Sequence, residues 1–239
     1  MSISCGIKGC GLGLLLVTAT VAAQAYDRIE QYETRQLEGW TLRVHRQLLN
    51  ETVLVEDTLR LLECQLRQIV RVVPTNALTR LREVPIWIEL AHPRHPCMCY
   101  HPSAEWLREH DMNPEKAGSV EIANAKTFLQ WTHSQPMMVL HELAHAYHHR
   151  VVKHDQPDLK AAFERAKASG DYDAVLHING KRQRHYALSN DQEYFAEGSE
   201  AFFGTNDFYP FVRAELKEHD PELYALLARL WGVEKPSKP

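Results

Sequence analysis

The stretch His141-Glu142-Leu143-Ala144-His145 places two histidines four residues apart, with a glutamate directly after the first. If the stretch is helical, positions i and i+4 lie on one face, so both imidazoles can reach a single metal ion. Glu142 lies beside them without being a ligand, and a carboxylate held there can accept a proton from water. The pattern therefore predicts a zinc site that carries out hydrolysis.

A zinc ion used in catalysis usually takes three protein ligands and leaves the fourth position open, so a third ligand is needed. The metzincin form of the motif requires glycine at position 148 and histidine at position 151, which here are His148 and Val151. A glutamate from a later helix is the other possible third ligand. The stretch NDQEYFAEGSEAFF carries three carboxylates on one helix face, namely Glu193, Glu197 and Glu200. Their burial beside apolar residues is costly without a cation or hydrogen-bond partners, so a metal site explains them.

HELAH, followed by YALSNDQEYFAEGSEAF, resembles the catalytic domain of the anthrax lethal factor family, a gluzincin group of zinc metallopeptidases. The resemblance covers two short blocks of the chain. It implies a zincin-like metallopeptidase fold and one Zn2+ ion, held by His141, His145 and Glu193. It also implies that Glu197 is the carboxylate that orients one of these ligands.

The same resemblance assigns the general base to Glu142 and oxyanion stabilisation to Tyr186, which precedes Glu193 by seven residues. The expected activity is that of an endopeptidase, with a peptide or protein as substrate. Asp191 and Gln192 differ from the family's residues before the third ligand, and substrate preference does not carry over. Two other functions stay open: a non-catalytic zinc-holding binding protein of the same fold, and a zinc hydrolase acting on a non-peptide amide.

Hydrophobic periodicity predicts strands early in the chain and helices late, which is the α+β class. The resemblance implies that the strands form a small mixed sheet, followed by the motif helix and a mainly helical C-terminal half. The expected strands are 39–49, 84–90 and 118–125. The expected helices are 52–73, the motif helix at 135–152 with Pro136 in its first turn, 157–168, 191–204, and one or two within 208–231. Asn179-Gly180 predicts a hairpin.

The strand at 118–125 lies just before the motif helix and has two open roles. In one, it forms a sheet edge that pairs with an extended peptide substrate. In the other, it is an ordinary interior strand.

The first 25 residues differ from the rest of the chain. Lys8 is their only charged residue, an apolar run follows from Leu12 to Val21, and Ala23-Gln24-Ala25 fits a cleavage site. This pattern predicts a secretory signal peptide at 1–25, and hence a secreted or periplasmic protein. An uncleaved membrane anchor is the rival interpretation, but the apolar run is short for a spanning helix. Residues 26–239 then form one domain, with a sheet-containing half at 26–134 and a mainly helical half at 135–239.

Composition excludes some partners. Of the 239 residues, 44% are hydrophobic and 24% are charged, with a net charge of −4. No strongly basic run favours nucleic acid, and no second apolar run approaches membrane-spanning length. The oligomeric state stays open.

Three cysteines remain after the predicted signal peptide. In an oxidising compartment we expect Cys64 to form a disulfide with Cys97 or Cys99. The proline-rich stretch HPRHPCMCYH could instead hold a second metal ion through His92, His95, Cys97, Cys99 and His101. A structured loop is the favoured interpretation of this stretch, so one metal ion is expected per chain.

Overall fold

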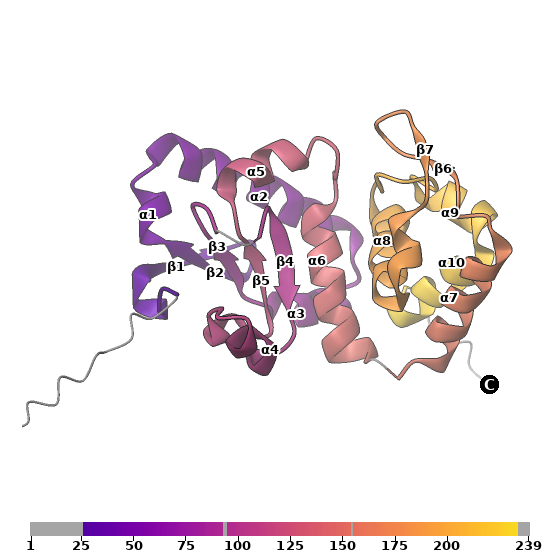
Figure 1. The fold of residues 1–239 in the computed structure, drawn as a ribbon, viewed down its shortest axis with the longest axis horizontal. Coiled ribbons are helices and arrows are strands. Elements are labelled where there is room, and N and C mark those ends of the chain that lie inside the picture. The colour runs from indigo at the N-terminus through magenta and orange to yellow at the C-terminus, as the bar shows by residue number, and fades with distance from the viewer. Residues whose placement is uncertain (1–25, 93–94, 154, 234–239) are drawn as a thin grey trace, which may run out of the picture.

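The structure is a computed structural model that describes residues 26–92, 95–153 and 155–233. A mixed sheet with its helices forms one half, and a helical layer forms the other (Figure 1). Helix α6 lies between the sheet and helix α8 (Figure 1). This arrangement confirms the α+β class, with the sheet before the motif helix and helices after it.

The sheet has the strand order β1-β2-β3-β5-β4. Its strands are β1 (Tyr32–Leu37), β2 (Trp40–His45), β3 (Ile86–Ile88), β4 (Met98–His101) and β5 (Ser119–Ile122). The three central strands are parallel, and the edge strands β1 and β4 are antiparallel to their neighbours. The central strands are rich in branched apolar residues, which suits strands that are buried on both faces.

Five α-helices belong to this half, namely α1 (Arg46–Leu49), α2 (Thr52–Val72), α3 (Thr75–Arg82), α4 (Ala104–Glu109) and α5 (Ala125–Trp131). Two short 3-10 turns are η1 (Ile29–Gln31) and η2 (Pro114–Lys116). Helix α2 buries Leu62, Leu66 and Ile69, which recur at helical spacing and pack in the main core. The apolar stripe of α2 therefore packs in the core, where the helix contacts α1, α5 and α6.

The motif helix α6 (Met138–Tyr147) continues into the π-helical segment η3 (His148–Val152). Leu140, Leu143 and Ala144 are fully buried, so this helix lies deep in the core. The expectation for Pro136 is wrong, because the helix begins at Met138 and Pro136 lies in the preceding turn. His148, the first residue after this helix, is buried although histidine is polar.

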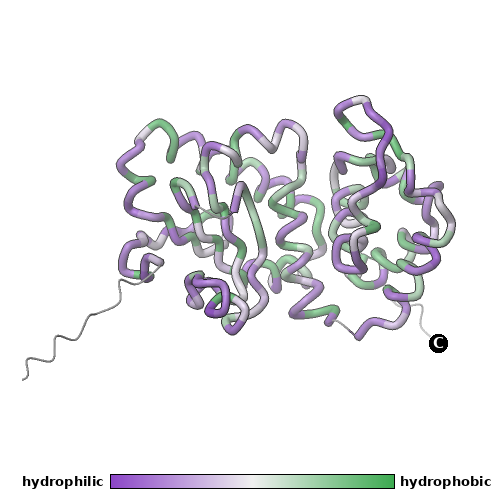
Figure 2. The backbone as a smooth tube through the Cα atoms, viewed as in Figure 1, coloured by the Kyte–Doolittle hydropathy of each residue, from purple (hydrophilic) through white to green (hydrophobic). Residues whose placement is uncertain are grey.

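The helical half consists of α7 (Pro157–Ser169), α8 (Asp191–Phe203), α9 (Arg213–His219), α10 (Pro221–Leu230), the 3-10 turn η4 (Tyr186–Ser189), and the hairpin strands β6 (Val175–Leu176) and β7 (Arg182–Gln183). The hairpin turns at Gly180, whose φ of 83° suits glycine. Its tip projects from the molecule and is mostly hydrophilic (Figure 2). Trp231 stacks on Tyr147 and on Phe195, which joins the end of α10 to both α6 and α8.

Strand β5 is interior, because it pairs with β3 on one side and β4 on the other. The edge-strand role considered for 118–125 is therefore wrong, and the edge beside the motif helix is β4. Sequence reasoning missed β4, since it assigned the proline-rich stretch to a loop.

The expected disulfide is also wrong. Cys64, Cys97 and Cys99 are free cysteines. Cys64 is exposed on α2, whereas Cys97 is buried with its Sγ 3.3 Å from Met138 Sδ. Helix α2 turns its apolar face to the core, which leaves the Cys64 thiol on the side away from the two cysteines of the β4 region.

The predicted signal peptide at 1–25 lies outside the described residues. Among the residues that are described, no helix has the length and apolar character needed to cross a bilayer.

Candidate active site

The two motif histidines project from α6 toward one point. His141 and His145 are one turn apart, and their Nε2 atoms lie 3.1 Å from each other. Their rings stand nearly perpendicular, at an interplanar angle of 81°. The i, i+4 spacing predicted from the sequence therefore brings the two nitrogens together.

The third group comes from α8. Asn190 caps this helix, because its side-chain oxygen accepts hydrogen bonds from the backbone N–H groups of Gln192 and Glu193. The cap places Glu193 in the first helical turn, facing α6. Its Oε2 atom lies 3.1 Å from His141 Nε2 and 3.3 Å from His145 Nε2.

These three atoms have the spacing that a zinc ion requires. Bonds of about 2.0–2.1 Å to a tetrahedral ion place two ligand atoms about 3.3 Å apart. The observed separations of 3.1, 3.1 and 3.3 Å are close to that distance. Two imidazole nitrogens and a carboxylate oxygen are also a donor set typical of catalytic zinc. The residues present therefore fit a zinc ion.

The other two carboxylates of α8 lie behind His141. Glu200 Oε1 is 2.7 Å from His141 Nδ1, whereas Glu197 Oε1 is 3.6 Å away. The carboxylate that hydrogen-bonds His141 is therefore Glu200, and the role expected of Glu197 by resemblance stays a prediction. Donation from Nδ1 to Glu200 leaves the lone pair of Nε2 directed at the shared point, as a metal ligand requires.

Charge and burial compete at this site. Burial alone would lower the pKa of His141, but its hydrogen bonds to Glu193 and Glu200 raise that pKa well above its ordinary value. Burial opposes the charged form of Glu193, yet hydrogen bonds from both histidines lower its pKa. Glu197 and Glu200 have raised pKa values because they are buried. An excess of carboxylates over cationic groups in one buried place is suited to a bound cation.

A cavity of about 410 Å³ opens onto these groups, and all six residues singled out from the sequence line it. They are His141, Glu142, His145, Tyr186, Glu193 and Glu197. Tyr186 comes from η4, which is capped by His185, and its side chain is half exposed. Burial and the nearby Glu193 carboxylate raise the pKa of Tyr186, so its hydroxyl keeps its proton.

The opposite wall of the cavity is the edge strand β4, which contributes Met98, Cys99 and Tyr100. Trp131, at the end of α5, stands at this cavity with 40% of its surface exposed. Sequence reasoning assigned no role to β4 or Trp131. The alternation of Cys97, Cys99 and His101 is the signal that could have identified the strand.

No protein-family model matches the sequence, and no curated protein matches it either. Among solved structures, the chain is similar to the PRO-PRO endopeptidase PPEP-2 from Paenibacillus alvei, with 20% sequence identity and a TM-score of 0.39. The similarity covers 70% of this chain and 87% of that chain. At this level no residue role is transferred, and the resemblance to the lethal factor family stays a prediction.

Proposed function

We propose that this chain is a zinc-dependent endopeptidase of the gluzincin type, with one Zn2+ ion bound by His141, His145 and Glu193. The observation that carries the proposal is the convergence of the two Nε2 atoms and Glu193 Oε2 to within 3.3 Å of one another in an open cavity. Export is proposed only from the sequence of residues 1–25.

Zinc at this point would supply a Lewis acid for the scissile carbonyl and a lowered pKa for the attacking water. Glu142 accepts the proton of that water and delivers it to the leaving amine, since it lines the cavity directly after the first ligand. Tyr186 donates a hydrogen bond to the oxygen that gains negative charge. Glu200 holds His141 through Nδ1, which keeps Nε2 free to bind.

An extended peptide is the substrate that this cavity suits best. Among the described residues β4 is an edge strand that pairs with β5 alone, so its other side can form backbone hydrogen bonds with a peptide. The same strand lines the cavity that contains Glu142. Strand pairing beside the reacting groups favours a peptide substrate over a small non-peptide amide.

The decisive variant is Glu142→Gln, which keeps the shape of the side chain but cannot accept a proton at neutral pH. We expect this variant to fold and to bind zinc like the parent, and to lose about a hundredfold or more in peptide cleavage. The matched control is Glu164→Gln, which alters an exposed glutamate of α7 that does not line the cavity. Cleavage of a peptide library should be measured beside zinc content and melting temperature.

The background for this assay is the parent protein treated with a chelator. If cleavage by the parent never exceeds this background on a peptide library or an unfolded protein, the peptidase proposal is wrong. Equal cleavage by the parent and the Glu142→Gln variant would assign the general base elsewhere.

A further inference from the structure

A second group of metal-binding side chains lies on the sheet, outside the three ligands described above. Cys99 of β4 stands directly opposite Glu121 of β5 in the antiparallel register. His101 is two residues after Cys99, so the pleat places it on the same face. Val120 and Ile122 alternate with Glu121 and belong to the hydrophobic core. The three polar side chains therefore share the other face of the sheet.

Their donor atoms lie close together. His101 Nε2 is 2.6 Å from Glu121 Oε2 and 3.5 Å from Cys99 Sγ. One ligand atom from each of the three residues lies within 4.8 Å of the other two. His101 and Glu121 are buried, with 3% and 0% of their surfaces exposed. Thiolate, imidazole and carboxylate together form a donor set that suits zinc.

A buried cluster of charged side chains adjoins this group. Lys116 Nζ lies 2.5 Å from both Glu89 Oε1 and Glu121 Oε1, and all three residues are buried. Tyr32 donates a further hydrogen bond to Glu89 but carries no charge. With His101 neutral, as a metal ligand must be, two carboxylates and one ammonium leave one negative charge in excess, which is costly in a buried place. A divalent cation bound together with the Cys99 thiolate would bring the sum to zero.

Further metal-binding side chains surround the group. The ring of His95 lies 5.8 Å from that of His101, and His92 stacks on His95 at 5.2 Å. His95 Nε2 is 3.2 Å from Met112 Sδ. Imidazole, thiol and thioether side chains thus lie near one another around His101, and Lys116 hydrogen-bonds Glu121 beside them.

We propose that Cys99, His101 and Glu121 form a second metal site, which takes zinc or another divalent ion with affinity for sulfur. Its ligands come from β4 and β5, whereas those of the proposed catalytic ion come from α6 and α8. The cysteine distinguishes the two sites chemically, since His141, His145 and Glu193 include no sulfur. This proposal replaces the single ion expected from the sequence with two.

Cobalt substitution tests the proposal, because only the proposed second site contains a cysteine sulfur. Protein with its thiols kept reduced is stripped of metal, loaded with Co2+ and separated from free ion by gel filtration. Thiolate ligation produces a sulfur-to-cobalt charge-transfer absorption in the near ultraviolet, which a site of histidine and glutamate alone does not produce. We expect two equivalents of cobalt and this absorption in the parent. The absorption and one equivalent should be lost in Cys99→Ser.

Two variants are matched controls. Cys64→Ser removes an exposed cysteine of α2 and should leave both equivalents and the absorption unchanged. His145→Ala should lose the other equivalent and keep the absorption, so failure of the catalytic site is distinguished from failure of this one.

The proposal is overturned if the folded parent binds cobalt without the charge-transfer absorption, because the cluster is then an ion-pair network only. It is also overturned if the absorption survives in Cys99→Ser and disappears in Cys97→Ser. Circular dichroism establishes that each variant is folded. The first of these outcomes is measured on the parent protein, so it overturns the proposal even if a variant fails to fold.

Discussion

The three carboxylates of α8 differ in what they touch, although they lie on one helix face. Glu193 faces the two Nε2 atoms, and Glu200 accepts from His141 Nδ1. Glu197 lies between them, with its Oε2 atom 3.7 Å from His185 Nδ1. The helical spacing i, i+4, i+7 predicts that all three face α6. It does not predict which one hydrogen-bonds His141, because that depends on side-chain rotamers and on how closely α6 and α8 approach.

The proposed catalytic role of Tyr186 depends on its hydroxyl group, which a Tyr186→Phe substitution removes. If its hydroxyl stabilises the oxyanion, Tyr186→Phe should lower kcat by about ten- to a thousandfold while KM and zinc content change little, because the contact forms mainly in the transition state. Steady-state kinetics on a defined peptide measure both constants. Tyr209→Phe is the control, since Tyr209 does not line the cavity. An unchanged kcat would leave Tyr186 as a half-exposed surface residue without a catalytic role.

At the scale of elements, the long and regular segments could be predicted from sequence. Helix α2 matches the expected 52–73 closely, because its apolar residues recur at helical spacing over its whole length. Strand β1 was missed because Glu33, Thr34, Arg35 and Gln36 show no apolar alternation, and it is held by pairing with β2. Strand β4 was missed because prolines surround it, and its position depends on β5, a partner about twenty residues away. Short elements of this kind are set by tertiary pairing, which one sequence does not reveal.

The turn η4 links the stability of the helical half to pH. His185 caps this turn by accepting from the backbone N–H of Ala187, and its ring stacks on Phe208. Burial, with the nearby His219 and His177, lowers the pKa of His185 to about 3. An unfolded histidine has a pKa of about 6.5, so between these values the unfolded chain binds more protons than the native one. Stability from this group is complete above about pH 6.5 and decreases as the pH falls toward 3.

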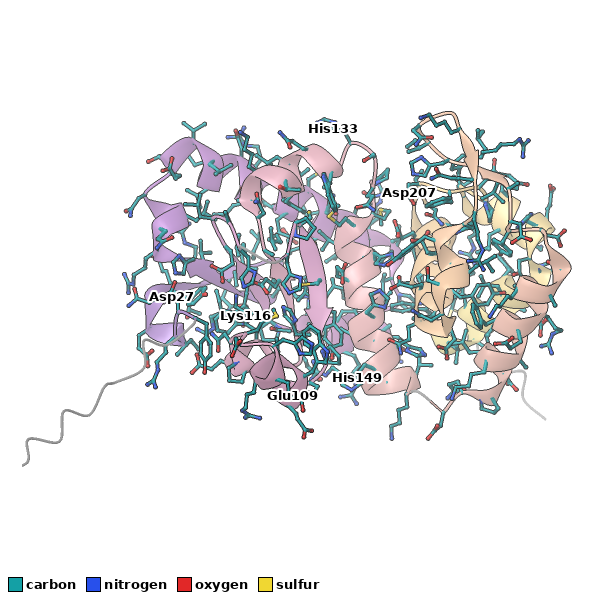
Figure 3. All side chains as sticks on the ribbon, in the orientation of Figure 1. Asp27, Glu109, Lys116, His133, His149 and Asp207 are labelled. Atoms are coloured by element: carbon teal, nitrogen blue, oxygen red, sulfur yellow. The ribbon has the colours of Figure 1, made fainter. Side chains whose placement is uncertain are left out.

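The variant His185→Asn tests this pH dependence, because asparagine can still cap the turn but does not titrate. We expect the free energy of unfolding to fall less between pH 7.5 and pH 4.5 in this variant than in the parent (about 1–3 kcal/mol less). Urea unfolding with a chelator present at both pH values gives the comparison without metal binding. His133→Asn is the control, since His133 is exposed (Figure 3). Equal pH dependence in the His185→Asn variant and the parent would contradict the assignment.

At the scale of the whole molecule, the proposed catalytic ion would join the sheet-containing half of the fold to the helical half. Helix α6 packs on the sheet side, and α8 belongs to the helical layer. The contact between them already includes Tyr147, Trp231 and Phe195 in one aromatic stack. His141 and His145 come from one side of this contact and Glu193 from the other, so an ion bound there is a cross-link between segments that are far apart in sequence.

Metal removal should therefore lower the melting temperature of the whole chain. An ion that binds only the native state, at about a hundred times its Kd, contributes about 2.7 kcal/mol to the free energy of unfolding. For a chain of this size each kcal/mol shifts Tm by about 2–4 °C, so we expect a chelator to lower Tm by about 5–10 °C. Differential scanning calorimetry with zinc and with a chelator measures this shift. The variant His145→Ala should lose the part of the response that comes from this ion, because one ligand of the cross-link is missing, whereas Cys99→Ser should lose only the part that comes from the proposed second site. A response of equal size in His145→Ala and in the parent would show that the stabilising ion binds somewhere other than between α6 and α8.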